Sequence, residues 1–115
     1  MLNIERVKME VKGITLEDYE WEVYLFENGL IPKEMYQPNG LLNKKKVYMT
    51  ALSILESVAN NPSMMKDYVI DDMTVSQFHE NLMARIDQLQ NKIDNLKDDV
   101  KNIEPDSSFF MLFAD

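Results

Sequence analysis

The sequence predicts an all-α protein, a small helical bundle with a long C-terminal helix. Helix-breaking residues are scarce, with three glycines and four prolines in 115 residues. Toward the C-terminus, apolar residues recur at spacings that alternate between four and three, which is the pattern of one apolar face on a long helix. We call these residues the seam, and they are Leu82, Ile86, Leu89, Ile93, Leu96, Val100 and Ile103.

The length and composition fit one domain. A chain of 115 residues with 45% apolar residues can bury a modest core. We expect a helical domain over residues 1–104, followed by a linker and an apolar tail over residues 105–115. The absence of cysteine excludes disulfides and thiolate metal sites. The net charge of −8 argues against general nucleic-acid binding through phosphates. No apolar stretch approaches the ~20 residues that a membrane span needs.

The first helix is expected over residues 4–12. Asn3 precedes it and is a suitable N-cap, and Gly13 follows its last turn. Its apolar face would consist of Ile4, Val7 and Val11. A short amphipathic helix is therefore predicted at the start of the chain.

A second helix is expected to begin at Thr15 and to stop at Gly29. Asp18 follows Thr15 at the third position, in an arrangement close to a capping box. From helical spacing, its buried face is predicted to consist of Leu16, Tyr19, Val23, Phe26 and Leu30. The acidic residues of this segment fall mostly off that face, so we interpret them as its solvated side.

A connector and a third helix follow. Residues 31–43 contain Pro32, Pro38 and an Asn-Gly pair, which are turn signals. Asn43 is a plausible cap for a helix that Pro62 closes. The apolar residues of that helix form a broad stripe of neighbouring pairs, which predicts a central and well-buried helix. They are Val47, Tyr48, Ala51, Leu52, Ile54, Leu55, Val58 and Ala59.

The last helix is expected from Val75 to Glu104, with Thr74 and Gln77 in a capping-box arrangement and Pro105 after its end. Residues 68–76, just before and into this helix, are partly strand-like in composition. A short extended segment or a tiny hairpin is therefore the alternative at that point of the chain.

Two kinds of partner fit the seam. The a positions of the heptad are β-branched and the d positions are mostly Leu. This choice favours a free parallel dimer. In that dimer, however, Lys92 would face Lys97 and Asp99 would face Glu104, so the flanking charges select no dimer. Packing on other helices of the same chain, or of an assembly, fits the seam equally well.

A second apolar feature lies in the tail. It consists of Phe109, Phe110, Met111, Leu112 and Phe113. Such a run is costly in water, so it either folds back on the core of its own chain or fills a groove on a partner. Its position behind a polar linker at the end of a long helix favours a role in partner binding.

Catalytic chemistry is poorly supported. His79 is the only histidine, and we interpret it as a surface or capping residue. No phosphate-binding glycine loop or metal-ligand spacing is present in the sequence. Asp67, Asp71 and Asp72 match no calcium loop, and we interpret them as solvated charges. We therefore expect no catalytic residue, no metal site, no cofactor and no enzymatic activity.

The middle of the chain resembles the head–tail connector family of tailed phages, also called DNA-packaging or head-completion adaptors. The similar stretches include Glu27–Leu30 (ENGL), Tyr48–Pro62 (YMTALSILESVANNP), Met65–Tyr68 (MKDY) and Asp72–Ser76 (DMTVS), followed by the helix that carries Leu82. The resemblance covers about residues 4–95, whereas the end of the seam and the tail extend past it.

The resemblance implies a non-enzymatic structural protein of the virion, assembled in the host cytoplasm. Many copies would form a ring at the head–tail junction, docked on the portal protein and on neighbouring copies. The ring would extend the DNA channel and carry the stopper or tail protein, with no membrane contact and no sequence-specific DNA binding. The tail residues Phe109–Phe113 would reach into the portal or a neighbouring subunit. The alternative is a free-standing coiled-coil dimer that acts as a regulatory or binding module.

Overall fold

A computed structural model describes residues 1–69 and 73–103 of the chain, and the side chains within residues 1–69 and 73–96. The predicted all-α class is confirmed, because the described residues form five helices. In chain order these are α1 (Asn3–Glu10), α2 (Asp18–Glu27), α3 (Leu41–Ala59), α4 (Pro62–Tyr68) and α5 (Val75–Ile103). The long C-terminal helix therefore starts at the predicted residue.

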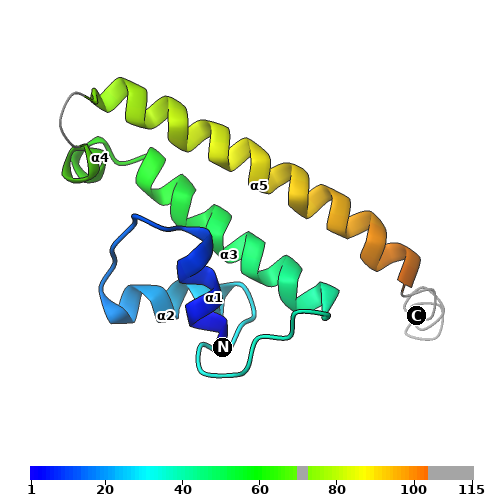
Figure 1. Cartoon of the computed structure of the whole chain (residues 1–115). Coiled ribbons are helices and arrows are strands. Elements are labelled where there is room, and N and C mark those ends of the chain that lie inside the picture. Colours follow the sequence, from blue (N-terminus) through cyan, green and yellow to red (C-terminus); the bar gives the residue numbers. More distant parts are fainter. Residues whose placement is uncertain (70–72, 104–115) are drawn as a thin grey trace, which may run out of the picture.

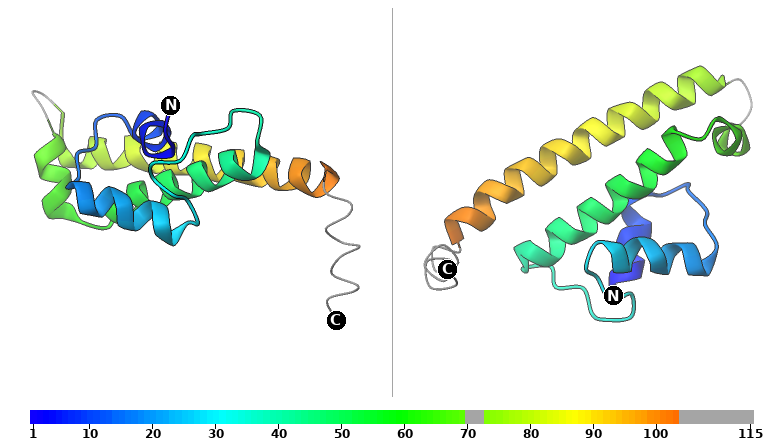
Figure 2. Two further views of the ribbon diagram at one scale, coloured as in Figure 1. Left: turned by 90° about the horizontal axis from the view of Figure 1, so that it is seen from below. Right: turned by 180° about the vertical axis from the view of Figure 1, so that it is seen from behind.

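The helices are arranged around α3. Figure 1 shows α3 and α5 side by side and antiparallel, with the short α4 at the end where the chain passes from one to the other. The α1 and α2 helices pack against α3 from the other side. The views in Figure 2 show α5 running past the N-terminal end of α3. The molecule is elongated, with principal extents of 56 × 27 × 25 Å.

The core follows from the broad apolar stripe of α3. Val47, Ala51, Ile54, Leu55 and Val58 are fully buried. α3 contacts each of the other four helices, so it needs an apolar surface wider than a single stripe. The central position predicted for this helix is confirmed.

The two predicted asparagine caps are wrong. Leu2 and Gly40 have extended backbones and occupy the N-cap positions, so Asn3 and Asn43 fall inside α1 and α3. The side chain of Asn3 is buried and donates a hydrogen bond to the carbonyl of Ile31 at 3.0 Å. Both asparagines are engaged in contacts with distant segments, which compete with local capping.

The buried face predicted for the second helix is wrong at three of its five residues. Leu30 is buried and Leu16 packs against the core, but both lie outside α2. Trp21 and Leu25 are the buried residues of this helix, whereas Tyr19, Val23 and Phe26 are exposed. The helix begins at Asp18, with Glu17 rather than Thr15 as the N-cap. Apolar residues lie on both sides of α2, so spacing alone could not identify the side that meets α3.

Among the described residues of the segment 68–76 none forms a strand, although Val69 has an extended backbone. Tyr68 ends α4 and Val75 begins α5, while Val69, Met73 and Thr74 between them are neither helix nor strand. The Tyr68 ring stacks on Phe78 at a centroid distance of 5.9 Å, and its hydroxyl donates to the carbonyl of Thr15 at 3.0 Å. These tertiary contacts override the strand-like composition. Across the described residues, the only β-bridge joins Leu2 and Met35.

Candidate functional site

The described part of the seam packs inside the chain. Leu82, Leu89, Ile93 and Leu96 are buried, and Ile86 is partly buried against the core. α5 lies along α3, which covers this face of α5 within the same chain. The side chains of the last two seam residues, Val100 and Ile103, lie outside the described part.

Polar contacts bind α5 to its neighbours. Arg85 donates a hydrogen bond to the carbonyl of Glu10 at the end of α1. The Tyr48 ring of α3 lies 5.9 Å from the Arg6 guanidinium and 5.4 Å from the Lys92 ammonium. Cation–π contacts of this kind contribute about 0.5–1 kcal/mol each at exposed sites. Tyr48 thus connects α1, α3 and α5.

Arg6 remains charged in this setting. Burial lowers the pKa of its guanidinium, but interactions with Glu10 and Tyr36 raise it by more, so the net pKa shift is upward. Arg6 and Glu10 lie 3.0 Å apart in the i, i+4 arrangement. This pair has the geometry of a structural contact.

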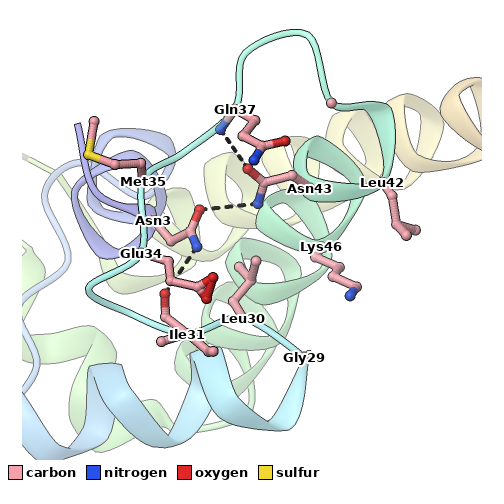
Figure 3. A pocket seen from close by; sticks show the side chains of 11 residues that line it. Asn3, Gly29, Leu30, Ile31, Glu34, Met35, Gln37, Leu42, Asn43 and Lys46 are labelled. Carbon is pink, nitrogen blue, oxygen red and sulfur yellow. Dashed lines mark hydrogen bonds between the residues drawn. The ribbon is translucent and has the colours of Figure 1, made fainter.

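A cavity opens where the segment between α2 and α3 meets α1 and the start of α3. It measures about 330 Å³ and is drawn in Figure 3. Asn43 forms one wall, where its side chain donates to Asn3 Oδ1 at 3.1 Å and accepts from the Gln37 backbone at 2.7 Å. The Asn3 amide in turn donates to the Ile31 carbonyl. The connector is thereby fastened to α1 and α3.

The buried polar side chains of this cavity are hydrogen bonded, and apolar side chains lie around it. Every buried side-chain nitrogen or oxygen atom among the described residues has a hydrogen-bond partner. Around the cavity, Ile31, Met35 and Leu42 keep large apolar side chains in solvent. We call these three residues the rim. Exposed apolar side chains that lie close together are a feature of interaction surfaces.

The sequence-based reasoning missed the rim. The turn signals of residues 31–43 predict a connector, but they carry no information on which side chains face solvent. The available signal was the presence of four large aliphatic residues in a segment otherwise rich in turn formers.

The other residues singled out from the sequence do not converge on one site. His79 is partly buried on α5, and Asp67 is exposed on α4. Asp71, Asp72 and the tail residues Phe109–Phe113 lie outside the described residues. The structure therefore brings the buried seam into the core and places the rim at the surface.

No family model, no curated protein and no solved structure matches this chain. Within the described residues, no helix combines the length and apolarity that crossing a membrane requires.

Proposed function

We propose that this chain is a structural subunit of a phage or prophage head–tail connector ring. It would dock on the portal protein and on neighbouring copies, and extend the DNA channel for attachment of a stopper or tail protein. The observation that carries the proposal is the exposed rim of Ile31, Met35 and Leu42 beside a closed helical core. A closed core with unpartnered apolar surface fits a protein that completes its contacts in an assembly.

Two further features support this proposal. Residues 4–95 resemble the adaptor pattern in their order of helices and breaks. The net charge of −8 suits a channel lining past which DNA must slide without binding. In the assembled ring, the tail residues Phe109–Phe113 would dock in a groove on the portal or on the next subunit.

The alternative of a free coiled-coil dimer meets a structural obstacle. Leu82, Leu89 and Leu96 are already buried in the monomer. A dimer through the same seam would require α5 to separate from α3 and would expose the α3 core. Burial of each such leucine contributes about 1.5–3 kcal/mol. Moving α5 from α3 to a partner helix therefore gains little free energy unless the partner replaces every contact that α3 provides.

The test is the native mass of the full-length chain, alone and mixed with a tailed-phage portal protein. We expect a monomer when the chain is dilute and a ring bound to the portal in the mixture. Met35→Ser in the rim should weaken portal binding. Met83→Ser is the matched control, because Met83 is also an exposed methionine but lies on α5, outside the rim, and this variant should leave portal binding unchanged. A tight dimer that does not bind the portal protein and does not dissociate on dilution would contradict the proposal.

A further inference from the structure

The outer face of α2 carries a row of large apolar side chains that nothing in the described chain covers. Tyr19, Val23 and Phe26 are 68%, 49% and 59% exposed. Their spacing of four and three residues places them on one side of the helix. Trp21 and Leu25 occupy the opposite side, against the core. The row is therefore a continuous apolar ridge that faces away from α3, and we call it the α2 ridge.

Acidic residues border this ridge on both sides. At about 100° per residue, Asp18 and Glu22 fall along one edge of the α2 ridge, and Glu20 and Glu27 fall along the other. Within the described residues, the one ion pair is Arg6–Glu10, so none of these four carboxylates is paired with a cation there. Lys8 does approach α2, but it lies over the Trp21 ring on the buried side.

We propose that the α2 ridge docks a basic amphipathic helix of a partner protein. The partner helix would present an apolar row between two rows of lysine or arginine. Its apolar residues would cover Tyr19, Val23 and Phe26, and its cations would meet the two acidic edges. Charge complementarity of this kind speeds association and selects the partner, while the apolar contacts supply most of the affinity.

The charge pattern argues against two other occupants. A second copy that docked through the same ridge would bring the acidic edges of two α2 helices together, which is repulsive. The apolar tail of this chain is flanked by Glu104, Asp106 and Asp115, and residues 104–115 contain no lysine or arginine. That tail would also place carboxylates against carboxylates. A basic partner helix satisfies both the apolar row and its borders.

This proposal does not depend on the proposed role in a phage head–tail ring. The ridge belongs to α2, whereas the rim of the connector cavity belongs to the segment between α2 and α3 and to the start of α3. Any assembly that offers a basic helix would satisfy it.

The experiment measures binding of a fluorescent helical peptide to the full-length chain by anisotropy. The probe is a designed amphipathic helix with a leucine row between two lysine rows, and its control carries glutamate in place of every lysine. We expect the lysine peptide to bind and the glutamate peptide not to bind. Raising the salt concentration should weaken binding of the lysine peptide, because exposed charges are screened within about 10 Å at 0.1 M salt.

Variants of the chain assign the binding surface. Val23→Ala with Phe26→Ala should raise the Kd about tenfold or more, since truncated central apolar anchors dominate such interfaces. Met83→Ala, an exposed apolar residue on α5, should leave the Kd within about twofold, as expected for a residue outside the interface. Glu22→Gln with Glu27→Gln should raise the Kd several-fold at low salt and much less at high salt.

Three results would overturn the proposal. The first is equal binding of the lysine and glutamate peptides. The second is loss of self-association on Val23→Ala with Phe26→Ala, which would make a second copy the occupant. The third is peptide binding that arises only in the full-length Phe109→Ser, Phe110→Ser variant, which would assign the ridge to the tail of the chain itself.

Discussion

At the scale of single residues, two asparagines fasten the connector. Asn43 in α3 is hydrogen bonded to the side chain of Asn3 and to the backbone of Gln37, and Asn3 is bonded to the carbonyl of Ile31. These bonds join positions up to 40 residues apart in the sequence. The geometry of the rim therefore depends on two amide side chains that lie beneath it.

Asn43→Ala should destabilise the fold by about 1 kcal/mol, because it removes the hydrogen-bond partner of the part-buried Asn3 Oδ1 and of the exposed Gln37 amide. Thermal unfolding followed by circular dichroism measures this change. Asn91→Ala is the matched control, since Asn91 is exposed on α5 and alanine favours helix there. Equal melting temperatures for the two variants would show that the hydrogen bonds around Asn43 contribute nothing to stability.

At the scale of elements, α2 and α5 differ in how clearly the sequence marks their buried sides. Apart from the exposed Met83 and Ala84, the apolar residues of α5 with described side chains lie on one face, which meets α3. In α2, apolar residues occur at six of ten positions, on both sides of the helix. The α3 surface then selects Trp21 and Leu25, which leaves the α2 ridge in solvent.

Leu89→Ala should lower the free energy of unfolding by about 2–5 kcal/mol, since it opens a cavity between α5 and α3. Met83→Ala on the same helix should change it by less than about 0.5 kcal/mol, because Met83 is exposed. Urea unfolding measures both. Leu89→Asp should be more damaging still, because it buries an unpaired charge. An unchanged midpoint for the Leu89 variants would mean that α5 does not pack on α3 in solution.

Trp21→Ala and Phe26→Ala compare the two sides of α2 directly. The first should cost about 3–5 kcal/mol, because it removes a buried aromatic ring and its contact with Lys8. The second should cost less than about 0.5 kcal/mol, because its side chain is already in water. Chemical denaturation of the two proteins under the same conditions gives both values. The reverse order would restore the face predicted from the sequence.

At the scale of the whole molecule, we predict that the tail and the core are separable. Among the described residues, the main core is built from residues between Val7 and Leu89. Deletion of residues 106–115 should therefore leave the helical content and the melting temperature nearly unchanged, and should weaken binding to the portal or to neighbouring copies. Circular dichroism and native mass measure the two effects. Unfolding of the truncated chain would show instead that the tail belongs to the core.

The sequence by itself determined the all-α class, the central helix α3 and the long helix α5. Those features follow from local signals, namely scarce helix breakers and apolar residues at helical spacing. Only the tertiary structure decided that the described seam packs on α3, that Trp21 is buried while Phe26 is exposed, and that Asn3 and Asn43 bond to each other. The physical reason is that spacing places residues on a face, whereas the partner of that face is set by contacts between segments far apart in the chain.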